Sequence, residues 1–135
     1  MGYRSDVRSL IYGDPDSTQA FWTKHVLANN AMIKDHPELI DRYSFHNGQE
    51  RICVIDLTVE SWKWYEVYEH VEAWNDMLTD AEETFKLCYE FVRVGEEEGD
   101  IEHQRSAEQL NYLYSHTQIV ADLPIREEEP TNEKD

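Results

Sequence analysis

The order of apolar and polar positions along the chain predicts alternating strands and helices. Residues 3–12 have the mixed apolar faces of a strand, which ends at Gly13. Asp14 and Pro15 form a helix start, because an aspartate side chain caps the first turn and a proline loses no hydrogen bond at the first helical position. The broad apolar face that follows predicts a helix that ends just before Pro37.

A hairpin and a second helix come next. Residues 39–46 and 51–60 are its predicted arms, and the Asn-Gly pair between them is the strongest turn signal in the sequence. Apolar residues spaced by three and four then predict a helix with one stripe against a sheet. The stripe consists of Val67, Val71, Trp74, Leu78, Ala81 and Phe85. Residues 87–94 and 110–121 return as strands.

The predicted order, β-α-β-β-α-β-β, defines the fold class as α+β. We expect a mainly antiparallel sheet with two helices on one face, and a ferredoxin-like arrangement with one added strand is the nearest common form. A chain of 135 residues fits one domain, which we expect to comprise residues 1–123. Residues 124–135 form an acidic tail that we predict to be disordered, because its last nine residues include no large apolar side chain.

Charge divides the chain into two unequal parts. The whole chain has 12 Lys and Arg against 29 Asp and Glu, a net charge of -17. Residues 1–55 hold six basic and seven acidic side chains, a net charge of -1, whereas residues 56–135 hold six and twenty-two, a net charge of -16. Direct binding of nucleic acid needs clustered Lys and Arg on the protein, so we expect none.

The sequence shows no feature of a membrane or secreted protein. No apolar run approaches the roughly 20 residues of a membrane span. The first six residues lack the charged and apolar segments of a secretory signal. We therefore expect a soluble protein of the cytoplasm that has no contact with a membrane.

Ten acidic residues form the predicted interaction surface. Five lie on the second helix at spacings of 3, 4, 4 and 3, which places them along one exposed face about 20 Å long. Five more follow the strand at 87–94, and they would extend this surface if both groups lie on the same side. The ten are Glu69, Glu72, Asp76, Asp80, Glu83, Glu96, Glu97, Glu98, Asp100 and Glu102.

Two interpretations of the acidic row stay open. Duplex DNA presents phosphates on a comparable length scale, so a rigid acidic row could occupy a groove that another protein uses for nucleic acid. Alternatively, an amphipathic helix needs a polar outer face and glutamate is a good helix former, so the charges only confer solubility. The uneven distribution of charge along the chain favours keeping the first interpretation.

Catalytic and metal-binding chemistry is poorly supported. The six histidines show no HExxH pattern, and residues 96–102 lack the ligand order of an EF-hand, so we predict no metal and no cofactor. Cys53 and Cys88 lie in apolar stretches, where inert packing is the usual role of a thiol. No P-loop, GxSxG or GxGxxG pattern occurs, so we expect that the protein is not an enzyme.

Three stretches carry a resemblance to other proteins. They are Gly2-Tyr3-Arg4-Ser5-Asp6-Val7, Lys63-Trp64-Tyr65, and Tyr89-Glu90-Phe91-Val92-Arg93-Val94-Gly95-Glu96 followed by Asp100-Ile101-Glu102. In this order they resemble a family of small acidic proteins encoded by tailed bacteriophages and prophages. The family has no assigned activity, so the resemblance provides no catalytic residues. It implies a phage accessory protein that acts in the bacterial cytoplasm, and the Glu-rich end of this chain departs from the family.

Together these observations predict a phage accessory protein that acts by binding another protein. Its acidic helix and the following loop would engage a basic surface of a host protein, such as a nucleic-acid-binding or defence protein, as a nucleic-acid mimic or inhibitor. The first alternative is a phage structural or assembly factor whose charge only maintains solubility. The second alternative is a small enzyme whose site is not recognised from sequence.

Overall fold

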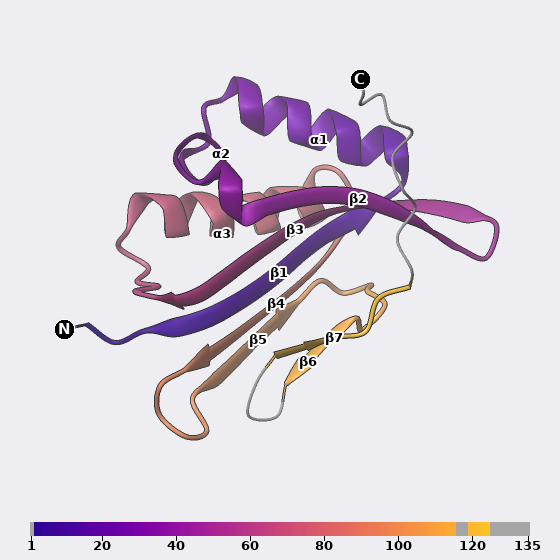
Figure 1. Cartoon of the computed structure of the whole chain (residues 1–135). Helices are drawn as coiled ribbons and strands as arrows, with labels where there is room; N and C mark the ends of the chain where they lie inside the picture. The colour runs from indigo at the N-terminus through magenta and orange to yellow at the C-terminus, as the bar shows by residue number, and fades with distance from the viewer. Residues whose placement is uncertain (1, 116–118, 125–135) are drawn as a thin grey trace.

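A five-stranded antiparallel sheet forms the centre of the molecule (Figure 1). The computed structural model describes residues 2–115 and 119–124. The sheet has the order β2-β3-β1-β4-β5. Its strands are β1 (Ser5–Gly13), β2 (Ile40–Asn47), β3 (Glu50–Trp62), β4 (Cys88–Gly95) and β5 (Ile101–Arg105). The other elements are α1 (Pro15–Leu27), α2 (Ala31–Asp35), the 3-10 turn η1 (Pro37–Leu39), α3 (Glu69–Glu83), β6 (Leu113–Ser115) and β7 (Ile119–Ala121).

The strand connections follow a split βαβ pattern. The segment that contains α1 joins β1 to β2, and β3 lies between these two strands. In the same way, α3 joins β3 to β4, with β1 between them. This is the ferredoxin-like arrangement, with β5 added beside β4. The predicted α+β fold with a mainly antiparallel sheet is confirmed.

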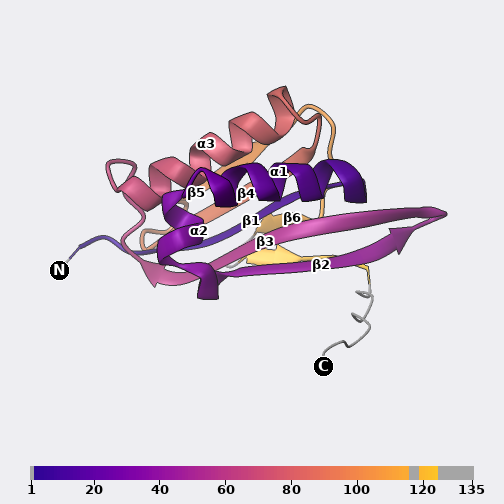
Figure 2. The same cartoon turned by 90° about the horizontal axis from the view of Figure 1, so that it is seen from above.

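Helices cover one face of the sheet, and a short hairpin lies against the other. Viewed from above, α1, α2 and α3 all lie on the same side of the strands (Figure 2). The core beneath them includes Phe21, Met32, Ile55, Leu57, Trp74, Met77 and Phe91. On the opposite face, β6 and β7 close a second core that includes Leu10, Tyr12, Phe45, Val54, Val92 and Leu113. The sheet is therefore buried on both faces, where one covered face was predicted.

The first predicted helix is divided in two. Asp14 caps α1 as expected, because its side chain accepts a hydrogen bond from the backbone N–H of Ser17. At Asn29 the backbone has a φ of 57°, which a helix cannot contain. The side chain of Asn30 then accepts a hydrogen bond from the backbone N–H of Met32, so α2 begins with a cap of its own.

The predicted stripe of the second helix is correct except at its start. Helix α3 begins at Glu69, so Val67 lies before it and is 87% exposed. Val71, Trp74, Leu78 and Ala81 are buried, as the spacing predicts, and Phe85, just past the helix, packs against the same core.

The segment after β4 differs from its prediction. Residues 96–100 form the turn, whereas Ile101 and Glu102 already belong to β5. The predicted strand at 110–121 is the β6–β7 hairpin, and its residues 116–118 lie outside the described residues. The predicted disordered tail also lies outside them from residue 125 onward.

Candidate functional site

The solvent face of α3 holds four exposed carboxylates. They are Glu69, Glu72, Asp76 and Glu83. Because the apolar residues of α3 are drawn into the core, the positions three and four apart on the opposite side project outward. Within the described residues, none of the four side chains has a hydrogen-bond or ion-pair partner. This row is therefore an accessible part of the predicted surface.

The helix dipole has opposite effects on the carboxylates at the two ends of this row. Glu69 and Glu72 lie in the first turn of α3, where the positive end of the helix dipole stabilises an anion. Glu83 lies in the last turn, where the dipole disfavours a carboxylate, and this turn contains no basic residue. Glu83 therefore works against the stability of α3.

Asp80 belongs to the same row but serves the fold. Its carboxylate accepts hydrogen bonds from Lys24 Nζ at 2.9 Å and meets His25 Nε2 at 2.7 Å, both from α1. Partial burial alone would raise the pKa of Asp80, but hydrogen bonds with Thr84, Lys24 and His25 outweigh burial and leave the pKa lowered. Asp80 therefore joins α3 to α1 and offers less to a partner than its neighbours do.

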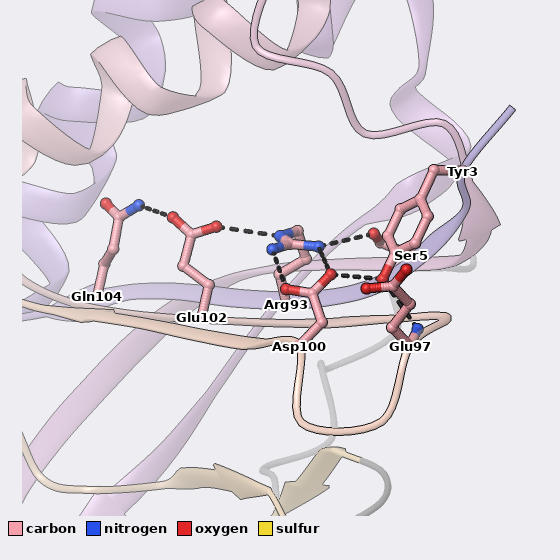
Figure 3. Close-up of polar contacts among 7 residues, drawn as sticks. All are labelled: Tyr3, Ser5, Arg93, Glu97, Asp100, Glu102 and Gln104. Carbon is pink, nitrogen blue, oxygen red and sulfur yellow. Dashed lines mark hydrogen bonds and ion pairs between the residues drawn. The ribbon is translucent and has the colours of Figure 1, made fainter.

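A polar network holds two of the predicted loop acids in internal contacts (Figure 3). The guanidinium of Arg93 lies between Asp100, with Nη2 to Oδ1 at 2.9 Å, and Glu102, with Nε to Oε1 at 3.0 Å. Gln104 Nε2 donates to Glu102 at 2.7 Å, and Tyr3 Oη donates to Asp100 at 2.5 Å. The network therefore joins the start of β1 to β4, to β5 and to the turn between them.

The protonation of this network is fixed by its contacts. Hydrogen bonds from Arg93 and then from Tyr3 lower the pKa of Asp100. The hydrogen bond to Asp100 in turn raises the pKa of the Tyr3 phenol. Asp100 is therefore a carboxylate and Tyr3 a neutral donor at neutral pH.

The remaining turn acids are more exposed. Glu96 accepts a hydrogen bond from the backbone N–H of Arg4 at 2.8 Å. The backbone N–H of Glu97 donates to Tyr3 Oη at 2.9 Å, and the side chain of Glu97 is exposed. Glu98 is exposed as well. Charged groups therefore remain accessible at the tip of the β4–β5 hairpin.

The ten predicted residues form two groups. Helix α3 lies on the helix-covered face of the sheet, whereas the turn at residues 96–100 lies at the end of the β4–β5 hairpin, below the helix layer in Figure 1. Asp100, in the turn, and Glu102, in β5, both contact Arg93. The row on α3 is one continuous face, and the turn is a separate feature.

A small cavity lies between α3 and the strands β4 and β5. Its volume is about 170 Å³. Its lining residues are Trp64, Glu66, Asn75, Phe91, Arg93, Glu102 and Gln104. Sequence reasoning included only Glu102 among these as a candidate site residue. Asn75 and Gln104 occupy no motif, and only the packing of α3 on the strands brings them together.

Other candidate chemistry is limited in the part of the chain that is described. No group of three or more His, Cys, Asp or Glu side chains is placed to hold a metal ion there. Cys53 and Cys88 are reduced and partly buried. Burial raises the pKa of the Cys88 thiol, so this group is not an activated nucleophile. The helices of residues 2–115 and 119–124 include none with the length and apolar character to cross a membrane.

The fold and the surface define an α+β protein with a split βαβ sheet and an acidic helix face. Comparisons of the chain with protein family models, with curated proteins and with solved structures find no match. The resemblance of residues 2–102 to phage proteins therefore stays a prediction. What the protein does has to be argued from its own surface.

Proposed function

We propose that this protein binds a basic surface of a host protein through the exposed face of α3. The observation that carries the proposal is the row of Glu69, Glu72, Asp76 and Glu83, which is exposed and has no ion-pair partner among the described residues. Its partner in a phage-infected cell would be a nucleic-acid-binding or defence protein, whose site the row would block. Long-range attraction would speed the encounter of the two proteins.

The internal contacts of the other acids support this choice of residues. Asp80, Asp100 and Glu102 already contact cationic side chains, so a partner would have to compete for them. Glu83 is held in the helix turn where the dipole disfavours it. A residue that lowers the stability of its own helix is more readily explained by a role in binding than by a role in folding.

The test compares two variants with the same total charge. One carries Glu69→Gln, Glu72→Gln and Asp76→Asn on α3. The matched control carries substitutions to glutamine at three exposed acids outside the row. These control positions are Glu50, Glu60 and Glu108. Each tagged chain is used to capture proteins from a bacterial lysate at low salt, and circular dichroism checks that each is folded.

We expect the original chain and the control to retain the same basic protein, and the α3 variant to lose it. Equal retention by the α3 variant and the control would show that the row is not the binding face. If the original chain forms a stable oligomer and captures no host protein, the assembly role replaces the proposed one.

A further inference from the structure

The cavity between α3 and the strands β4 and β5 is large enough for the end group of one side chain. Pockets for drug-sized ligands span about 300–1,000 Å³. This one encloses about 170 Å³, which suits one end group of a larger molecule. Its residues come from the segment before α3, from α3 itself and from two strands, so its shape depends on the whole fold.

The charges around the cavity favour a cation. Glu66 and Glu102 are in its wall. The single positive charge in the wall, on Arg93, is balanced by ion pairs to both Asp100 and Glu102. The balance of these four groups is negative, and the partial enclosure of the cavity weakens the screening of that charge by water.

Two amide oxygens of residues that line the cavity are open to a donor. Asn75 Oδ1 is shielded from solvent and accepts no hydrogen bond from the described residues. Gln104 uses its Nε2 to donate to Glu102, so its Oε1 is available as an acceptor. In Figure 3, Arg93, Glu102 and Gln104 form a row on the side of the strands where α3 lies. A guest with several N–H groups would supply the donors that Asn75, after a small turn of its amide, and Gln104 require.

The arrangement of acceptors adds a preference for a planar cation. Trp64 and Phe91, which are almost fully buried, close the apolar side of the cavity. A guanidinium group donates in several directions within its plane and can reach acceptors on different walls, whereas an ammonium group is a compact point charge. The cavity therefore fits an arginine side chain better than a lysine side chain.

The cavity also adjoins the proposed binding face. Asn75 lies three residues after Glu72, so the two side chains are neighbours on the surface of α3. We propose that this cavity receives the guanidinium group of an arginine from the basic partner. The source of that arginine rests on the proposed function, whereas the affinity of the cavity for a guanidinium does not.

The test uses a probe that needs no partner. N-acetyl-arginine amide is titrated into the full chain, and NMR follows the backbone amides, the side-chain amides of Asn75 and Gln104, and the indole of Trp64. We expect saturable shifts that centre on these three residues. The citrulline analogue, a neutral isostere of arginine, should cause no such shifts. Shifts spread evenly over the acidic surface, or equal shifts with citrulline, would overturn the proposal.

Two variants separate the cavity from the general charge of the chain. Glu66→Gln removes a carboxylate of the cavity wall and should weaken binding of the probe about two- to fivefold. Glu50→Gln, in β3, removes one exposed carboxylate outside both the cavity and the α3 row and should leave the affinity unchanged. Equal weakening by both would show that only net charge matters.

The outcome for the cavity is independent of the outcome for the proposed function. If the probe binds but the α3 variant still retains the host protein, the cavity is a guanidinium site and the proposed binding face is wrong. If the probe does not bind but the α3 variant loses the host protein, the binding face stands and the inference about the cavity fails.

Discussion

At the scale of single residues, a buried carboxylate holds the C-terminal hairpin on the sheet. Glu90 has no exposed surface and lies on the face away from the helices. It accepts hydrogen bonds from Tyr12 Oη at 2.5 Å and from the backbone N–H groups of Tyr112 at 3.0 Å and Leu113 at 2.8 Å. Such an anion is tolerated in an apolar core only because three donors surround it.

The first prediction concerns this carboxylate. Glu90→Gln puts an amide N–H₂ where donors already converge, so at least one backbone N–H of the hairpin loses its acceptor. We expect the free energy of unfolding in urea to fall by about 2 kcal/mol. Glu108→Gln, at an exposed position, is the control and should change it by less than about 0.5 kcal/mol. Equal stability of the two variants would show that the hairpin does not depend on Glu90.

The sequence alone does not show that Glu90 and its hydrogen-bond donors come together. Glu90 lies in a strand-like apolar stretch, and the pattern indicated the strand correctly. Its partners are 22 and 23 residues further on, in a hairpin that the sequence suggested only as a single strand. No local pattern shows that a glutamate in a strand will meet backbone donors from the next hairpin.

At the scale of elements, the acids of α3 look equivalent in sequence and differ in the structure. The spacing of the row predicts that its members share one helix face, and the exposure of Glu72 and Asp76 agrees with this prediction. The spacing could not reveal that Asp80 meets Lys24, because that lysine lies 56 residues earlier in the chain on another helix. Similarly, β5 is rich in polar and charged residues because it is an edge strand with Arg93 beside it, so its sequence resembles a loop.

The second prediction separates Asp80 from its neighbour. Asp80→Asn removes the charge that joins α3 to α1, and we expect the free energy of unfolding at neutral pH to fall by about 1 kcal/mol. Asp76→Asn should change it by less than about 0.5 kcal/mol, because Asp76 is exposed and has no partner within the described residues. Urea unfolding of the three chains measures the difference.

The pH dependence of the same variants provides a further check on the ion pair. Because the folded-state pKa of Asp80 is lowered, the folded protein binds a proton there less readily than the unfolded chain does. The stability that Asp80 contributes is therefore fully present above its ordinary pKa of 3.8 and is lost as the pH falls through the lowered value. The difference between the original chain and Asp80→Asn should shrink on acidification. A difference that stays constant would contradict the assignment.

At the scale of the whole molecule, the net charge opposes folding, while the proposed binding to a basic partner would be favoured by it. The chain carries a net charge of -17, and its described basic groups are partly committed to internal ion pairs, such as Arg8 with Asp56 at 2.6 Å. The remaining acids repel one another more strongly in the compact state than in the unfolded chain. The proposed partner would relieve part of this repulsion by covering the acidic face of α3.

Salt should therefore act in opposite directions on folding and on binding. Raising NaCl from about 0.02 M to about 0.3 M shortens the screening length to below 10 Å. We expect the free energy of unfolding to rise over this range, because the repulsion between like charges is screened, and the affinity for the basic partner to fall over the same range. The variant with Glu69→Gln, Glu72→Gln and Asp76→Asn has three fewer charges, so its stability should respond less to salt. Urea unfolding at each salt concentration measures the first effect and capture of the partner the second. A stability that falls with salt would mean that internal attractions such as those of Arg93 and Asp80 outweigh the repulsion.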